Sequence, residues 1–155
     1  MKNIWAPWRG EYVTGAKGSS CIFCKARQDG DGLILTSGDL CFAVMNRFPY
    51  TTGHCMVAPC RHVGDLTELS REELSGIMAM SQSILKAIRK ELNPEGFNVG
   101  FNLGSVAGAG IADHLHMHIV PRWKGDTNFM PVLSGAHIIS EHIEKTYEKI
   151  KRHFP

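Results

Sequence analysis

The sequence predicts an α+β domain: an antiparallel sheet of five strands with one long helix and a C-terminal helix. Three observations support this fold class. Short apolar runs follow one another with turn residues between them, as in hairpins. One long helical pattern separates the third run from the fourth, and a second amphipathic pattern closes the chain. Consecutive strands joined by hairpins, with a helix between them, are typical of antiparallel α+β domains.

The strands are predicted from apolar runs bounded by turn residues. The linker Ser37-Gly38-Asp39 has hairpin turn chemistry, and a Pro/Gly/Thr-rich loop spans Asn46–Gly53. A Gly/Ala-rich loop spans Gly104–Gly110. The five predicted strands are Leu33–Thr36, Leu40–Met45, His54–Ala58, Phe97–Leu103 and the run from Asp113 to Val120.

The long helix is predicted over Thr67–Leu92, where apolar residues recur at spacings of three and four. Ser70 and Glu73 form a capping box just before the apolar run, and Asn93-Pro94 stops the helix. The C-terminal helix is predicted over Ser134–Phe154. Its apolar face consists of Ile139, Ile143, Tyr147 and Ile150.

The chain has 155 residues, of which 43% are hydrophobic, so we expect one globular domain spanning 1–155. Residues 1–20 form an N-terminal arm whose Trp5, Trp8 and Tyr12 are expected to pack on the body of the subunit or on a partner. The net charge of +2 and the absence of a Lys/Arg run argue against a nucleic-acid partner.

The apolar segments are too short for a bilayer, because none approaches the 18 residues of a spanning helix. The N-terminus lacks the apolar core of a signal peptide, and we expect a cytoplasmic protein without a membrane partner. The five cysteines are an odd number, which favours thiols and metal ligation over a disulfide framework.

The run Asp113–Val120 contains three histidines at alternate positions, separated by apolar residues. Side chains alternate along a strand, so Leu115, Met117 and Ile119 are predicted to face the core while the imidazoles line the other, exposed face. Histidines two apart are roughly 6.5–7 Å apart at the backbone, close enough to act on one anion or one metal ion. Imidazole can serve at neutral pH as nucleophile, base or cationic donor.

A loop of small residues, Ala107–Ala112, comes directly before these histidines. Glycines allow backbone N–H groups to approach an anion closely, so loop and histidines together predict a phosphate site. Upstream, Cys21 and Cys24 have the C-x₂-C spacing of half a zinc site. Redox use of the two thiols and plain core burial are the alternatives. We expect a hairpin after the motif and not the helix of a thioredoxin-like unit, which argues against redox use.

The stretch His114-Leu115-His116-Met117-His118-Ile119-Val120 resembles the signature of the histidine triad family, in which apolar residues alternate with three histidines. Further motifs match in order: Cys21-x-x-Cys24, Asn46-Arg47-Phe48-Pro49, Thr52-Gly53-His54 and Ala58-Pro59-Cys60-Arg61-His62-Val63. The segment after the histidines, Val120–Phe129, and the pattern Trp-x-Pro-Trp-Arg near the N-terminus resemble the branch that contains diadenosine tetraphosphate phosphorylases.

The resemblance implies transfer of a nucleoside monophosphate. His116 matches the nucleophile that forms a nucleotidyl-histidine intermediate, and His118 matches the histidine that contacts phosphate oxygens and assists the leaving group. The substrate-binding positions that it implies are Phe23, Asn46, Asn102, Gly108, Ala109, Gly110, Ile111 and His118. Many relatives carry Gln or Ser where this chain has Gly110 and Ile111, so backbone N–H groups must replace side-chain donors there.

Zinc-bearing relatives imply that His62 and His114 complete the site begun by Cys21 and Cys24. This Cys₂His₂ set is typical of structural zinc. It would leave His116 and His118 for chemistry. His54, at the start of a predicted strand, is expected either to hydrogen-bond its loop or to have a role at the zinc or at the edge of the site.

We therefore expect an enzyme that cleaves dinucleoside polyphosphates, with diadenosine tetraphosphate preferred and either phosphate or water as acceptor. The alternatives are a nucleoside phosphoramidase, a non-catalytic zinc-containing nucleotide-binding module, and a metal hydrolase that uses all three histidines on one ion. The resemblance and the many apolar residues of the long helix also imply a homodimer.

Overall fold

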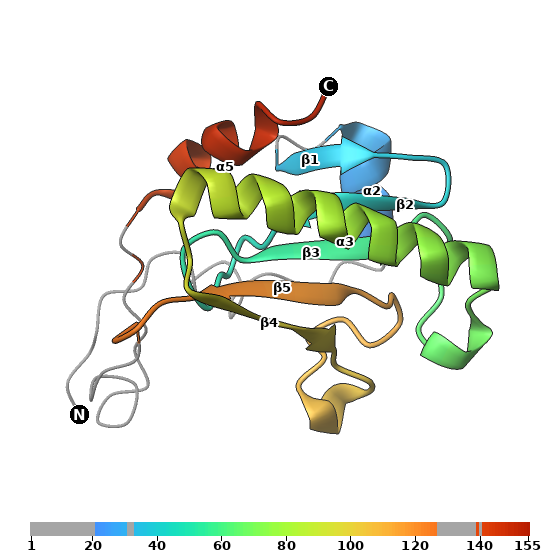
Figure 1. The fold of residues 1–155 in the computed structure, drawn as a ribbon. Helices are drawn as coiled ribbons and strands as arrows, with labels where there is room; N and C mark the ends of the chain where they lie inside the picture. The colour runs from blue at the N-terminus through green and yellow to red at the C-terminus, as the bar shows by residue number, and fades with distance from the viewer. Residues whose placement is uncertain (1–20, 31–32, 127–138, 140) are drawn as a thin grey trace.

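The computed structural model describes residues 21–30, 33–126, 139 and 141–155, and it has the predicted α+β architecture (Figure 1). The predicted N-terminal arm, residues 1–20, lies outside the described residues, as do residues 127–138. The five strands are β1 (Ile34–Ser37), β2 (Cys41–Met45), β3 (Cys55–Pro59), β4 (Gly96–Phe101) and β5 (Met117–Arg122). The helices are α2 (Ile22–Asp29), α3 (Arg71–Leu92) and α5 (Ile143–Lys151), with short 3₁₀ turns η1 (Leu66–Glu68) and η2 (Ser105–Ala107).

The sheet has the order β1-β2-β3-β5-β4, and every neighbouring pair is antiparallel. Strand β5 therefore lies between β3 and β4, while β4 forms one edge. His118 of β5 is paired with Met56 of β3 on one side and with Gly100 of β4 on the other. The third histidine thus lies in the interior of the sheet.

Alternation along the strands divides the apolar residues between two faces. Helices α3 and α5 pack on one face, over a core that includes Leu115, Met117 and Ile119, as predicted. On the opposite face α2 places Phe23 against Phe42 of β2, with ring centroids 6.3 Å apart. The three histidines share this second face, where Phe23 of α2 packs on His114 and His116.

Helix α3 begins one residue after Ser70, and both halves of the predicted capping box are present. The predicted start at Thr67 was too early, because Asp65 caps a separate 3₁₀ turn over Leu66–Glu68. Asn93, with φ of 47°, closes the helix in the left-handed region.

Two further elements begin at least four residues later than predicted, while the other strands start within one residue of the predictions. Within the described residues, the C-terminal helix begins only at Ile143, with His142 as its N-cap residue, instead of at Ser134. The fifth strand begins at Met117 and not at Asp113, because the Leu115 N–H donates to the carbonyl of Val63 (2.7 Å) before the pairing with β3 begins. Among the described helices, none combines the length and apolar character needed to cross a membrane.

Candidate active site and metal centre

The histidine face is more buried than its sequence pattern predicted. His114 has no exposed surface and His116 is 6% exposed, whereas we expected an open strand face. The cause is α2, whose Phe23 packs against both rings, with centroid distances of 5.2 Å to His114 and 4.9 Å to His116. Only His118 of the three stands partly open, beside a cavity.

The hydrogen bond of His116 fixes which of its nitrogens can react. Its Nδ1 lies 2.9 Å from the backbone carbonyl oxygen of His114. A carbonyl only accepts, so Nδ1 carries the ring proton and the lone pair is left on Nε2. The ring is thus held in the tautomer that a nucleophile needs.

A chain of three contacts likewise fixes the tautomer of His118. The N–H of Tyr50 donates to Nδ1 of His54 (3.1 Å), which places the His54 proton on Nε2. That Nε2–H donates to Nδ1 of His118 (2.9 Å). His118 therefore carries its own proton on Nε2, the nitrogen that remains for a ligand.

His54 is thus the functional residue whose position the sequence predicted only ambiguously. It is fully buried, and the amide of Asn46 also lies 3.3 Å from its Nδ1. Both expectations for His54 hold together, since it bonds its loop and touches the site. Tyr50, whose ring stacks on His118 at 5.8 Å, was missed, because a tyrosine in a turn-rich loop gives no sequence signal.

The environment keeps these imidazoles neutral at physiological pH. Burial, reinforced by the neighbouring His118 and His116, lowers the pKa of His54 to about 3. Burial and the neighbouring His116 lower the pKa of His118 to about 4. Burial also lowers the pKa of His116, against the opposing effect of its bond to the His114 carbonyl. A neutral His116 keeps the lone pair that attack on phosphorus requires.

A second cluster, beside the first, has the composition of a metal site. Cys21, Cys24, His62 and His114 each offer one ligand atom, and all four atoms lie within 4.8 Å of one another. The Cys21 Sγ lies 3.2 Å from His114 Nδ1, and the Cys24 Sγ lies 3.5 Å from His62 Nδ1. Tetrahedral zinc would place sulfur and nitrogen ligands about 3.6 Å apart, so the four residues fit that ion.

The surroundings of the cluster also suit a cation. The Nε2–H of His114 donates to the Pro59 carbonyl (2.9 Å), which leaves Nδ1 unprotonated and aimed at the two sulfurs. Burial and the adjacent Cys21 raise the pKa of the Cys24 thiol, so two neighbouring thiolates need a positive ion to offset their repulsion.

The local structure of the Cys-x₂-Cys motif corrects one expectation. The motif begins a helix, with Cys21 as the N-cap residue of α2, where we expected no helix. One helical turn brings Cys24 back beside Cys21. Because a helix is present, the local structure does not exclude redox use of the thiols. The two imidazoles favour a metal, since their Nδ1 atoms lie 3.2 to 3.6 Å from the cysteine sulfurs.

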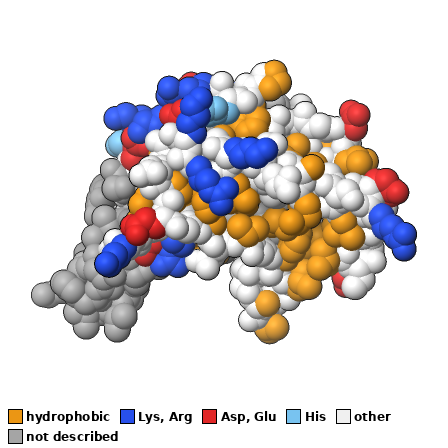
Figure 2. Space-filling view, in the orientation of Figure 1, with side chains coloured by type: hydrophobic (Ala, Val, Ile, Leu, Met, Phe, Trp, Pro, Cys, Tyr) orange, Lys and Arg blue, Asp and Glu red, His pale blue; other side chains and the backbone are white. Residues whose placement is uncertain are grey.

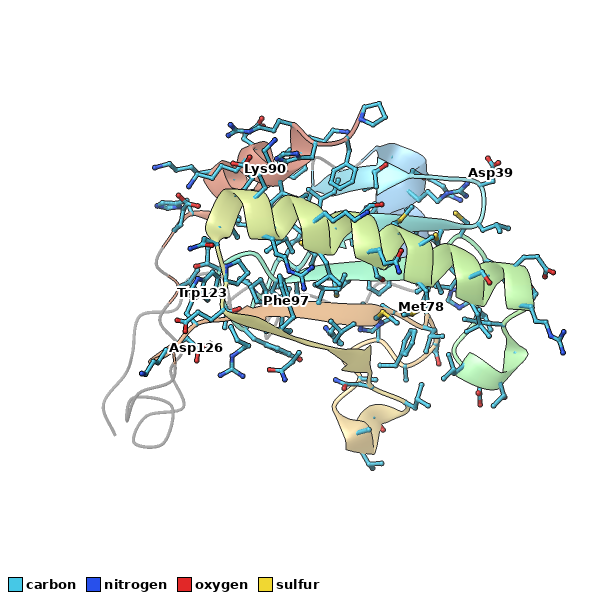
Figure 3. All side chains as sticks on the ribbon, in the orientation of Figure 1. Asp39, Met78, Lys90, Phe97, Trp123 and Asp126 are labelled. Atoms are coloured by element: carbon cyan, nitrogen blue, oxygen red, sulfur yellow. The ribbon has the colours of Figure 1, made fainter. Side chains whose placement is uncertain are left out.

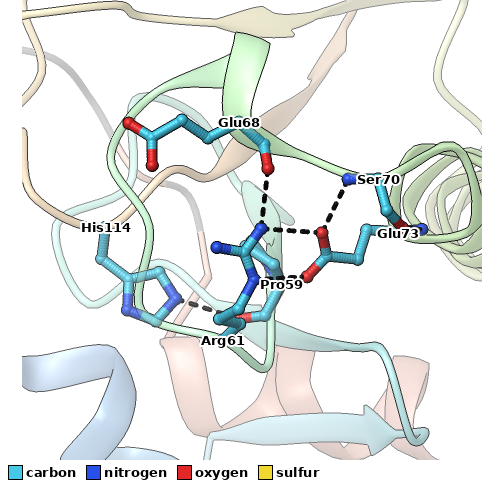
Figure 4. Close-up of polar contacts among 6 residues, drawn as sticks. All are labelled: Pro59, Arg61, Glu68, Ser70, Glu73 and His114. Carbon is cyan, nitrogen blue, oxygen red and sulfur yellow. Dashed lines mark hydrogen bonds and ion pairs between the residues drawn. The ribbon is translucent and has the colours of Figure 1, made fainter.

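An ion pair anchors the loop that carries His62. The Arg61 guanidinium donates twice to the Glu73 carboxylate, at 3.0 and 2.9 Å, and once to the Glu68 carbonyl at 2.8 Å. Glu73 also accepts from the Ser70 N–H in the capping box (2.8 Å). Figure 4 shows this network between the start of α3 and the segment Pro59–Arg61, beside His114.

The predicted substrate-binding residues lie on two sides of His116. Phe23 and the partly buried Ile111 belong to the apolar cluster on the α2 side. Asn102 lines the cavity with His118, and its amide donates to the Gly108 carbonyl (3.4 Å). The amides of Gly108 and Ala109 bond to carbonyls of their own loop. Among the described residues, the Gly110 and Ile111 amides have no such partner.

The chain is similar in sequence to known proteins. The model of the HIT domain matches residues 27–125. An AP-4-A phosphorylase of Mycobacterium tuberculosis is 38% identical over 157 residues, covering 94% of this chain and 80% of the relative. An adenosine 5'-monophosphoramidase of Schizosaccharomyces pombe is 36% identical over 104 residues, covering 66% of this chain and 74% of the relative.

One of the similar solved structures is of a zinc-bound protein. A Zn-bound histidine triad family protein of Mycobacterium smegmatis superposes with a TM-score of 0.69 at 30% identity, covering 86% of this chain and 92% of that chain. The fold, the three alternating histidines and the match to the HIT domain all indicate the same family. The chain belongs to the HIT domain family.

Proposed function

We propose that this protein is a nucleotidyl transferase or hydrolase that cleaves dinucleoside polyphosphates, with diadenosine tetraphosphate preferred. The observation that carries the chemistry is the His116 ring, whose Nδ1–H is bound to the His114 carbonyl at 2.9 Å and whose Nε2 holds the lone pair. The observation that supports the substrate is the similarity to an AP-4-A phosphorylase, which extends over 94% of the chain.

In the proposed reaction, His116 Nε2 attacks the α-phosphorus of the nucleotide. A P–N bond forms, and the P–O bond to the departing nucleotide breaks. His118 donates from Nε2–H to the phosphate oxygens or to the leaving oxygen. Inorganic phosphate or water then attacks the same phosphorus, the P–N bond breaks, and His116 is restored.

The remaining predicted residues would position the substrate. We propose that Phe23 and its apolar cluster receive the base and that Asn46 holds the ribose hydroxyls. Asn102 and the loop of Gly108, Ala109, Gly110 and Ile111 would contact the phosphate chain. The Gly110 and Ile111 amides support this role, because they offer donors where many relatives have side chains.

Product analysis tests the reaction and identifies the acceptor. The protein is incubated with diadenosine tetraphosphate, with and without inorganic phosphate. ADP with ATP, formed only when phosphate is present, identifies a phosphorylase, whereas AMP with ATP identifies a hydrolase. Intact substrate under both conditions would contradict the proposal.

A nucleoside phosphoramidase is the second candidate, and the similarity to the Schizosaccharomyces pombe enzyme favours it. The same His116 and His118 would cleave a P–N bond in place of a P–O bond. Release of AMP from adenosine 5′-phosphoramidate, without turnover of the dinucleotide, would select this alternative. Binding of both nucleotides with no turnover of either would indicate a non-catalytic binding module.

We also propose that Cys21, Cys24, His62 and His114 hold a structural zinc ion. The closed set of four protein ligands supports a structural role, since catalytic zinc keeps an open position. It also separates this site from a metal hydrolase that uses all three histidines, because His114 points to the cysteines. Metal analysis should find about one zinc per chain and less in Cys24→Ser, with Cys60→Ser as the control.

A homodimer is proposed through the edge of the sheet. Among the described strands, β4 pairs with β5 alone, and Val99 on it is 44% exposed. Apolar side chains gather between α3 and β4 (Figure 2), where Met78 of α3 is 52% exposed. Light scattering should report a dimer, which Val99→Lys should dissociate by placing a charge at the contact.

A further inference from the structure

A cavity of about 600 Å³ extends from His118 along β4 and β5. It is large enough for a nucleotide, since ligand pockets commonly measure about 300–1,000 Å³. Residues from both strands and from the loop before β3 line it, among them Tyr50, Asn98, Gly100, His118, Val120 and Arg122. We call this cavity the strand trough.

The register of the two strands gives the direction of the trough. Gly100 faces His118, and Asn98 faces Val120 one step further along. Arg122 lies four residues beyond His118 on the same face of β5, about 13 Å away at a rise of about 3.3 Å per residue. Asp126, which also lines the trough, lies beyond the end of β5 (Figure 3). One end of the trough is thus a catalytic histidine, and the other is an arginine.

The trough lies on the opposite side of the catalytic histidines from the apolar cluster. Phe23, Phe42 and Ile111 form that cluster beside His116, and none of them lines the trough. A dinucleotide attacked at its α-phosphorus has one nucleoside before that atom and a polyphosphate with a second nucleoside after it. The two parts require two subsites, one on each side of the reacting histidine.

The walls of the trough have the chemistry to bind a nucleoside phosphate. The Tyr50 ring is 46% exposed at the trough and stacks on His118, which suits it to the face of a base or to the ribose. The Arg122 guanidinium donates to Asn98 Oδ1 (2.9 Å) and to both carboxylate oxygens of Asp126 (2.5 and 2.8 Å), which balance its charge. These bonds fix a guanidinium at the far end of the trough, where its N–H donors can meet a phosphate in exchange for the carboxylate.

We propose that the strand trough is the subsite for the departing nucleotide, with Tyr50, Asn98 and Arg122 as its specificity-determining residues. The inference rests on the proposed function for the identity of the substrate. It goes beyond that function in assigning the trough to the second half of a dinucleoside polyphosphate. The trough would then select long substrates, whereas the attacked nucleoside monophosphate is held elsewhere.

Gly100 offers a way to fill the trough without disturbing the fold. A Cβ built at Gly100 meets no heavy atom within 4 Å, and its φ lies outside the left-handed region. Gly100→Leu therefore places an isobutyl group in the trough. Gly100→Ala is the matched control, since it adds only a Cβ at the same position, and that atom meets no heavy atom within 4 Å.

Binding measured in a His116→Asn background separates this proposal from the catalytic one, because no turnover is needed. Dissociation constants are determined for AMP and for diadenosine tetraphosphate. We expect the dinucleotide to bind at least about tenfold more tightly than AMP, an increment of about 1.4 kcal/mol. Gly100→Leu should remove this gain and leave AMP binding within about twofold, while Gly100→Ala should keep the gain.

Two results would overturn the assignment. One is a dinucleotide that binds no more tightly than AMP when the trough is intact. The other is a Gly100→Leu protein that loses affinity for AMP and for the dinucleotide equally. A third result separates the two proposals. If the His116→Asn variants bind as expected but the wild-type protein releases no product, the proposed function is contradicted and the subsite remains supported.

Discussion

Single residues in this site differ in role because their hydrogen-bond partners differ, although they share one side-chain type. His114 gives its Nε2–H to Pro59 and turns Nδ1 to the cysteines. His116 gives its Nδ1–H to a carbonyl and keeps a lone pair on Nε2. His118 accepts at Nδ1 from His54 and keeps a proton on Nε2. One ring can thus bind a metal, one can attack, and one can donate.

Replacement of the attacking ring tests this division. His116→Asn should lower turnover of diadenosine tetraphosphate by several orders of magnitude, because no other atom replaces the nucleophile. His153→Asn is a suitable control, since His153 bonds Glu91 at 2.7 Å outside the site. Steady-state rates, with circular dichroism to verify folding, provide the measurement. Substantial turnover by His116→Asn would contradict the mechanism.

His54 should act as a positioning residue through His118. His54→Leu removes the donor that fixes the His118 tautomer, so kcat should fall about tenfold, the value of roughly one hydrogen bond. His54→Gln supplies an amide N–H in its place and should recover part of that loss. A purely structural role predicts a different pattern, in which both variants lose thermal stability and kcat per folded molecule is unchanged.

At the scale of elements, local sequence patterns predicted the features that depend only on residues close together in the chain. Alternation placed Leu115 and Met117 in the core, and the Ser70–Glu73 pair marked the start of α3. Helix α2 could not be predicted in this way, because only Phe23 among its eight residues is buried. The burial of the histidine face and the bond from His54 to His118 depend on pairing distant segments, so sequence spacing alone does not contain them.

The Arg61–Glu73 ion pair connects the start of α3 to the loop that carries His62, a residue of the candidate metal site. Glu73→Gln preserves the capping box, which accepts Gln, but replaces the carboxylate that holds Arg61 next to His62. We expect faster loss of zinc to a chelator and a lower Tm. Glu72→Gln removes the same charge from the same helical turn and should leave the zinc release rate unchanged. Equal rates in both variants would show that the pair does not hold the loop.

At the scale of the whole molecule, the two faces of the sheet have separate tasks. The face under α3 and α5 contains the larger core. The other face buries His114 and His116 under α2, where the proposed zinc would fix Cys21 and Cys24 on either side of Phe23. Metal binding and the packing of Phe23 against His116 are therefore physically linked.

Burial of neutral histidines predicts how stability depends on pH. The folded-state pKa of His54 is lowered to about 3, whereas the unfolded value is about 6.5. Between these values the unfolded state binds the additional proton, so stability falls as the pH is lowered through this window. Near pH 5, His54 alone contributes a slope of about 1.4 kcal/mol per pH unit to the free energy of unfolding.

Urea denaturation of zinc-loaded wild type and His54→Gln between pH 7 and pH 4.5 measures this contribution. The wild type should lose stability more steeply than the variant, because glutamine does not titrate. Zinc ligation also weakens in acid, but it does so in both proteins and cancels in the difference of slopes. Parallel curves would mean that His54 takes up its proton as readily in the folded protein as in the unfolded chain, and that its burial does not keep it neutral.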